Sequence, residues 1–216
     1  MSSLLSRRNI PNILTMSRVA LAIAFFAILT PWSFRTSSLL RGESPDLWLI
    51  VAAAVFIIAA GTDALDGHLA RKWNVVSVFG RIMDPFADKV LVIGAFVYLA
   101  GPGFSNGEHS ISGVHPWMVA VILARELLVT SIRAAFESRG VNFSASVSGK
   151  WKMILQSVCV PLVLILPNIS IRSAPSWPQV AIVWATVLVT VWSAIPYIQR
   201  ALKTPSSPPP SETKPQ

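Results

Sequence analysis

The sequence is short of charge and has a single cysteine. Only 13% of its residues are charged, whereas 53% are hydrophobic, and the mean hydropathy is +0.58. This balance excludes an ordinary soluble globular domain. Because Cys159 has no second cysteine to pair with, an intramolecular disulfide is excluded. Its apolar surroundings predict a packed or lipid-facing thiol.

Acidic residues are also scarce, and the chain is therefore basic. The formal net charge is +8 and the sequence pI is about 10.4. The basic residues are dispersed along the ends of apolar runs and form no contiguous patch. This distribution argues against nucleic-acid binding. It favours contact with anionic lipid headgroups.

Several apolar runs reach about 18 residues, the length that predicts membrane-spanning helices. We expect an all-α integral membrane protein with six transmembrane helices and a short interfacial helix near residues 4–17. Residues 1–203 would form one membrane-embedded domain, and the Pro-, Ser- and Lys-rich residues 204–216 a disordered tail. The six predicted spans are residues 15–32, 47–72, 77–101, 115–138, 149–167 and 177–199.

The unequal distribution of lysine and arginine predicts the orientation. With six spans, both termini and the turns at 72–77 and 139–149 share one side, and that side carries most of the basic residues. The positive-inside rule then places the termini in the cytoplasm. The tryptophans support the same spans, because most lie near predicted span ends, as in an aromatic belt: Trp32, Trp48, Trp73, Trp117, Trp151 and Trp177.

Four aspartates, Asp63, Asp66, Asp84 and Asp88, flank the turn between the second and third spans. Spacings of three and four residues place each pair on one helix face. Counted from the turn, Asp63 and Asp84 lie at a similar depth of roughly 15 Å. Carboxylates in apolar surroundings repel one another unless protons or cations neutralise them. Oxygen ligands suit Mg²⁺ or Mn²⁺, and two such ions would balance four carboxylates.

Small residues accompany the aspartates. Gly67, Ala70 and Gly80 permit either close packing of helices or room for a flat nucleotide. Arg71 either binds a phosphate or marks the membrane boundary. The whole set is also compatible with an ion relay in a transporter, but a transporter would favour broken helices and internal repeats, and the sequence shows neither.

The complete pattern resembles the signature of the CDP-alcohol phosphatidyltransferases: Asp63-x2-Asp66-Gly67-x2-Ala70-Arg71-x8-Gly80-x3-Asp84-x3-Asp88. The resemblance extends from about Asn9 to Gln156. Its opening, Asn9-Ile-Pro-Asn12-x2-Thr15-x2-Arg18, is similar to that of a bacterial subgroup, the phosphatidylglycerophosphate synthases. The acceptor-side segment of that subgroup is similar to Arg125-Glu126, Arg133 and Gly149-Lys150-Trp151-Lys152 with Gln156.

The resemblance implies transfer of the phosphatidyl group of CDP-diacylglycerol to an alcohol, with release of CMP. It implies that Asp63, Asp66 and Asp84 hold the metal ions, and that Asp88 completes the second metal site and acts as general base. It also implies a homodimer in the bacterial cytoplasmic membrane, with the site facing the cytoplasm. The implied nucleotide-binding residues are Asn12, Thr15, Arg18, Asp66, Gly67, Ala70, Arg71 and Gly80.

Similarity to the subgroup implies sn-glycerol 3-phosphate as the acceptor. We expect Arg125, Arg133 and Lys150 to bind its phosphate, since the arginines share one face of the fourth span and Lys150 opens the fifth on the same side. Glu126 is expected to pair only imperfectly with Arg125, because adjacent side chains diverge on a helix. Lys152 is expected to mark a solvated interface. Another acceptor, in cardiolipin or phosphatidylinositol phosphate synthesis, stays an alternative.

Overall fold

The computed structural model describes residues 10–34, 47–73, 78–105, 110–139, 147–169 and 175–203. Within the helices, only the backbone is described at residues 10–15, 32–34, 63–73, 78–82, 84, 85, 147, 168 and 169. The predicted tail at 204–216 lies outside the described residues.

The described residues form helices and short turns, which confirms the all-α class. In chain order they are α1 (Ile10–Phe34), α2 (Leu47–Trp73), α3 (Val78–Leu99), a short 3₁₀ turn η2 (Pro102–Phe104), α4 (Pro116–Glu137), α5 (Val147–Ile169), α6 (Trp177–Trp192) and α7 (Ile195–Lys203). The bounds of α2 to α5 agree with the predicted spans to within two residues at each end. Long apolar runs closed by polar breakers account for this agreement.

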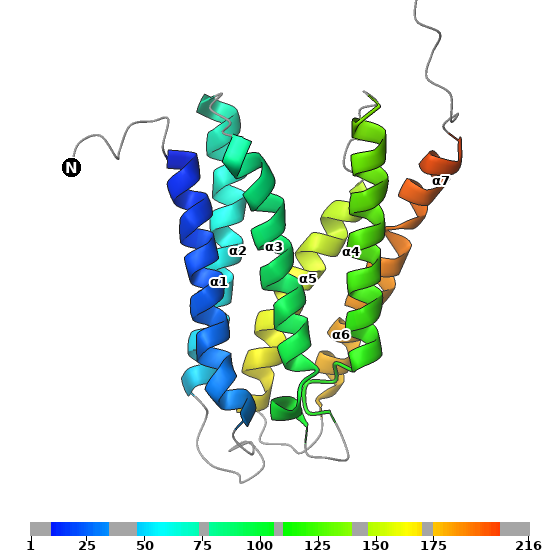
Figure 1. Ribbon diagram of the computed structural model, residues 1–216. Coiled ribbons are helices and arrows are strands. Elements are labelled where there is room, and N and C mark those ends of the chain that lie inside the picture. Colours follow the sequence, from blue (N-terminus) through cyan, green and yellow to red (C-terminus); the bar gives the residue numbers. More distant parts are fainter. Residues whose placement is uncertain are drawn as a thin grey trace, which may run out of the picture.

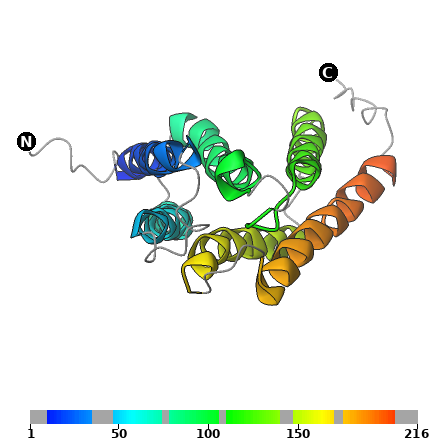
Figure 2. The same cartoon turned by 90° about the horizontal axis from the view of Figure 1, so that it is seen from below.

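The long helices run alternately in opposite directions and stand in two rows. Seen along the bundle, α1, α3 and α4 form one row, and α2, α5 and α6 form the other (Figure 2). The first turn of α1, the end of α2, the start of α3, the end of α4 and the start of α5 lie at the same end of the bundle, which is the upper end in Figure 1. We call it the α2–α3 end. These helix ends are grouped as the succession of predicted spans requires.

Two predicted boundaries are wrong. A separate short helix over residues 4–17 is not formed in the part that the structure describes, because residues 10–17 are the first turns of α1. The sixth predicted span is interrupted at Ser193 and Ala194, so that α6 ends at Trp192 and α7 follows. Pro196 explains the interruption, since a proline in a continuing helix lacks the N–H that would bond four residues back and its ring clashes there.

An apolar core joins α1 to α6. Phe25, Phe56 and Phe96 are fully buried in it, and Cys159 is buried as a free thiol, as predicted. Helices α1 and α3 approach closely at Gly94, where the ring of Phe26 lies over the position that a side chain would occupy. Phe26 in turn stacks on Tyr98, with ring centroids 5.7 Å apart. Gly94 therefore permits this helix contact.

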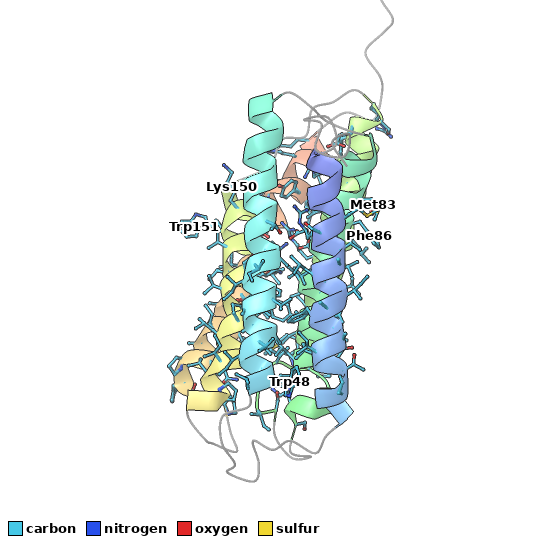
Figure 3. The ribbon with its side chains drawn as sticks, turned by 90° about the vertical axis from the view of Figure 1, so that its left-hand side faces the viewer. Trp48, Met83, Phe86, Lys150 and Trp151 are labelled. Carbon is cyan, nitrogen blue, oxygen red and sulfur yellow. The ribbon has the colours of Figure 1, made fainter. Side chains whose placement is uncertain are left out.

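The outer surface of the bundle is strongly apolar. Large side chains such as Ile23, Ile57 and Leu188 are more than half exposed, and contiguous exposure of this kind marks a lipid or protein contact. Among the residues that the structure describes, two helical stretches are able to cross a membrane by length and composition, Ser148–Pro167 and Trp177–Lys203. Shorter apolar helical stretches cover Met16–Pro31 and Leu47–Thr62. Trp48, near the opposite end of the bundle from the α2–α3 end (Figure 3), is more than half exposed.

We predict that a side chain at position 94 disturbs the α1–α3 contact. A Cβ placed on Gly94 lies 2.7 Å from Cε1 of Phe26, closer than side chains pack. Gly94→Ala should therefore lower the midpoint of thermal unfolding in detergent, by overpacking of about 1 kcal/mol or more. Gly61→Ala is the matched control, because its Cβ meets open space and alanine favours a helix. Equal midpoints for the two variants would contradict the proposed contact.

Candidate active site

The four motif aspartates lie on two consecutive helices that meet at the α2–α3 end. Asp63 and Asp66 belong to α2, and Asp84 and Asp88 to α3. Asp63 and Asp88 are each ten residues from that end of their helix, or roughly 15 Å along it. Asp66 and Asp84 are seven and six residues from it, or roughly 10 Å. The helix bounds thus correct the depth expected from sequence, in which Asp63 was level with Asp84.

Asp88 is the one motif aspartate whose side chain is among the described side chains, and it is partly buried. For the other motif positions and the two polar residues before Arg18, the structure gives the helical backbone and no side chain. These positions are Asn12, Thr15, Asp63, Asp66, Gly67, Ala70, Arg71, Gly80 and Asp84. Their predicted roles stay predictions.

Asp88 lines a small pocket between α3, α4 and α5. Its empty volume is about 260 Å³, counting space open to solvent. Charged and polar groups from all three helices face it together with apolar ones. The lining residues are Asp88, Lys89, Val92, Ile93, Glu126, Lys152, Met153 and Gln156. Helices distant in sequence therefore bring two carboxylates and two ammonium groups to one place.

Glu126 is the centre of the ion pairs at this pocket. Lys152 Nζ on α5 lies 2.6 Å from Glu126 Oε1, and Arg125 Nη1 lies 3.1 Å from the same oxygen. All three residues are at most 9% exposed. A single buried carboxylate oxygen thus binds two cations. The expectation that Arg125 and Glu126 pair imperfectly is wrong, because both side chains converge where the third partner from α5 enters.

Arg125 also contacts the break between α6 and α7. Its Nη2 donates to the carbonyl oxygen of Ser193 at 3.5 Å, and its Cζ lies 5.9 Å from the centroid of the Tyr197 ring. The Nε of Arg125 is buried and has no hydrogen-bond partner in the described part of the chain. The guanidinium is therefore fixed from two sides and retains one unused donor.

Lys152 and Gln156 lie one helical turn apart on α5 and both face inward. Gln156 Nε2 donates to Thr190 Oγ1 on α6 at 3.3 Å. Near the other pocket wall, Lys89 donates to the hydroxyl of Thr130, which links α3 to α4. These bonds link α5 to α6 and α3 to α4, and the Glu126–Lys152 ion pair links α4 to α5.

The other two predicted acceptor residues lie apart from Lys152. Lys150 is exposed, and Figure 3 shows it pointing away from the bundle, as does Trp151. Arg133, two turns beyond Arg125 toward the α2–α3 end, is partly buried and pairs with Glu137 at 3.4 Å. Of the predicted acceptor residues, Arg125 is therefore the one joined to the pocket residues by a described ion pair.

Arg18 of α1 is almost fully buried, with 1% of its surface exposed. It lies on the face that also buries Ala22, Phe25 and Leu29. A charged side chain on the core face of an apolar helix is costly and is a functional candidate by default. Its implied role in binding the nucleotide stays a prediction.

Comparison with known proteins adds a family match over most of the chain. The family model described as CDP-alcohol phosphatidyltransferase matches residues 8–192. This protein belongs to the CDP-alcohol phosphatidyltransferase family. The match covers every helix of the bundle from α1 to α6, so the pocket at Asp88 lies wholly within it.

Relatives with curated names align with this chain over nearly their full length. The Bacillus subtilis (strain 168) protein is 36% identical over 201 residues, covering 91% of this chain and 98% of the relative. The Escherichia coli (strain K12) and Salmonella typhimurium (strain LT2) proteins are 35% identical, each covering 89% of this chain and 94% of the relative. All three are named CDP-diacylglycerol–glycerol-3-phosphate 3-phosphatidyltransferase.

Sequence reasoning assigned Lys152 to the solvated interface, and this is wrong. Lys150 and Lys152 are about 200° apart around a helix, so only one of them can face the bundle. The available signal was Gln156: it lies four residues after Lys152 within an apolar run, and polar residues at that spacing share a face. In this phosphatidyltransferase-family chain, the inward lysine of the pair is Lys152.

We predict that the Tyr197 ring helps to hold Arg125. A cation over an aromatic ring is stabilised by about 1 kcal/mol, and Tyr197 is 3% exposed. Tyr197→Leu should lower the unfolding midpoint in detergent by more than Tyr197→Phe does, because the phenylalanine variant keeps the ring. If the phenylalanine variant lost as much as the leucine variant, the hydroxyl and not the ring would be the important group.

Proposed function

We propose that this protein transfers the phosphatidyl group of CDP-diacylglycerol to sn-glycerol 3-phosphate, giving phosphatidylglycerol phosphate and CMP. The observation that carries the proposal is the pocket in which Asp88 of the family motif faces the buried Glu126–Lys152 pair. The names of the relatives, which match over about nine tenths of the chain, support the same donor and acceptor. The new bond joins the acceptor hydroxyl oxygen to the phosphatidyl phosphorus, and the bond from that phosphorus to CMP breaks.

The donor set of the motif suits divalent ions. Four carboxylates on α2 and α3, at helical spacings of three and four, offer oxygen ligands only, which is the chemistry that Mg²⁺ and Mn²⁺ prefer. We propose that Asp63, Asp66, Asp84 and Asp88 hold two such ions. When bound, the ions offset the negative charge of the pyrophosphate.

Asp88 is the proposed general base. Its carboxylate faces the pocket from α3, where it can accept the proton of the acceptor hydroxyl as the new bond to phosphorus forms. A carboxylate that also binds metal is a weak base, so transfer of the proton accompanies bond formation and does not precede it.

The acceptor phosphate needs cations next to Asp88. Lys152 faces the same pocket, and Arg125 adjoins it through Glu126 and has an unused buried Nε–H. We propose Arg125 and Lys152 as the groups that bind this phosphate. Arg133 and Lys150, which lie nearer the α2–α3 end, would then meet the acceptor as it enters.

On the donor side, the proposed nucleotide contacts follow the family motif. Gly67, Ala70 and Gly80 would lie against the cytidine, and Arg71 near its phosphates. Arg18 would contribute from the core face of α1, where it is buried, together with Asn12 and Thr15 on the preceding turns.

We propose that α1 to α5, and α6 with α7, form six membrane spans, with the α2–α3 end in the cytoplasm of a bacterial cell. The apolar outer surface and the two stretches able to cross a membrane support this arrangement. Residues 1–203 would form the membrane domain and residues 204–216 a tail. By family resemblance we also propose a homodimer.

The proposal predicts which acceptor drives CMP release. Purified protein with CDP-diacylglycerol and Mg²⁺ or Mn²⁺ should release CMP rapidly with sn-glycerol 3-phosphate, and slowly with water, phosphatidylglycerol, inositol phosphate or serine. Chelation of the metal should stop the reaction. CMP release at equal rates with all of these acceptors would refute the acceptor. Ion flux in proteoliposomes without any lipid substrate would instead favour a transporter.

Asp88→Asn should reduce turnover by at least about 100-fold, since general-base catalysis contributes at least that factor. The variant keeps the size of the side chain, and its folding is checked by size-exclusion chromatography in detergent. Radiolabelled glycerol 3-phosphate reports turnover directly. Wild-type turnover in a folded variant would remove Asp88 as the base.

A further inference from the structure

The carboxylate of Glu126, at the pocket, pairs with two cations and is not one of the four motif aspartates. Glu126 Oε1 lies 2.6 Å from Lys152 Nζ and 3.1 Å from Arg125 Nη1. The three side chains come from α4 and α5 and are almost completely buried. Two cations without a carboxylate between them would repel each other strongly in such surroundings.

The geometry limits where each cation can lie. Arg125 is held on its other side by the Ser193 carbonyl and the Tyr197 ring, so its position is fixed by α6 and α7. Lys152 has a long flexible side chain, and Glu126 is the partner that the described ion pairs give it. Glu126 therefore determines where the ammonium group of Lys152 lies relative to Asp88.

We propose that Glu126 is a positioning residue that orients Lys152, next to the already fixed Arg125, for binding the phosphate of the acceptor. The inference rests on the proposed function, in which these two cations bind that phosphate. It assigns to Glu126 a role through Lys152 and no contact with the reacting atoms. A phosphate that reaches the pocket then finds two cations at fixed separation and does not have to order them.

Removal of Glu126 makes the pocket more positive, and the two roles that Glu126 could have predict opposite changes in the KM for the acceptor. If Glu126 acted only as a nearby negative charge, its removal would make the pocket more positive and would lower the KM for an anionic acceptor. If it positions Lys152, its removal raises that KM although the pocket becomes more positive. The direction of the change in KM separates the two roles.

The first variant is Glu126→Gln, which keeps the size of the side chain and removes its charge. We expect the KM for sn-glycerol 3-phosphate to rise by about 10-fold or more, as when one partner of a buried charge pair is lost. The KM for CDP-diacylglycerol should stay within about twofold. An unchanged or lower KM for glycerol 3-phosphate would overturn the proposal.

A double-mutant cycle tests whether Glu126 acts through Lys152. Lys152→Met should lower kcat/KM for the acceptor, and the Glu126→Gln/Lys152→Met double variant should lie within about threefold of Lys152→Met alone. If the two losses multiply, Glu126 acts independently of Lys152 and the proposal fails. A purely structural carboxylate would give this multiplied loss.

Glu137→Gln is the matched control, since it removes a carboxylate from the same helix at an exposed position paired with Arg133. It should not raise the KM for glycerol 3-phosphate. Folding of each variant is checked by its unfolding midpoint. If Glu126→Gln does not fold, Glu126→Asp, which keeps the charge and shortens the side chain, should still raise the acceptor KM, and a wild-type KM there would refute the role.

The wild-type protein separates this inference from the proposed function. If wild type uses glycerol 3-phosphate and Glu126→Gln leaves its KM unchanged, only the role of Glu126 is wrong. If wild type requires another acceptor that carries a free phosphate, the proposed function fails, and the same shift in KM for that acceptor supports Glu126. Activity solely with an acceptor that has no free phosphate would refute both.

Discussion

A buried carboxylate shared by two cations is the interaction on which the polar half of this bundle depends. Charges inside apolar helices are tolerated when they pair with one another, and Glu126 satisfies this condition for Arg125 and Lys152 at once. The pairing joins α4 to α5, while Arg125 reaches on to the α6–α7 break. The orientation of these helices about their axes is therefore coupled to the position of the charges beside Asp88.

The irregular features of the fold support this arrangement. The end of α6 leaves backbone carbonyls without helical partners, and that of Ser193 accepts from Arg125. Helix α7 then begins at Ile195, and its third residue, Tyr197, lies against the same guanidinium. On the other side of the bundle, Gly94 lets α1 approach α3, the helix that carries Asp84 and Asp88. The break between α6 and α7 thus helps to position Arg125, and Gly94 helps to position α3.

Much of the fold could be predicted from sequence, because long apolar runs bounded by polar breakers fix helix ends to within two residues for α2 to α5. The aspartate motif was found from its spacing. The rotation of each helix about its axis could not be predicted, and this rotation decides whether Lys150 or Lys152 faces inward. The Arg125–Glu126 pair was missed for a similar reason, since on an isolated helix the two diverge and only Lys152 from α5 draws them together. The end of α6 at Trp192 was also missed, because the prediction ran the sixth span through Pro196 without a break.

The shared carboxylate also bears on how the chain enters a membrane. Helix α4 contains Arg125 and Glu126 and is not among the stretches apolar enough to span by composition, whereas the following α5 is. In the proposed arrangement, the lysine that completes the charge cluster emerges from the ribosome some 26 residues after Glu126. Stable integration of α4 is then a cooperative event in biogenesis, finished when α5 arrives beside it at the translocon.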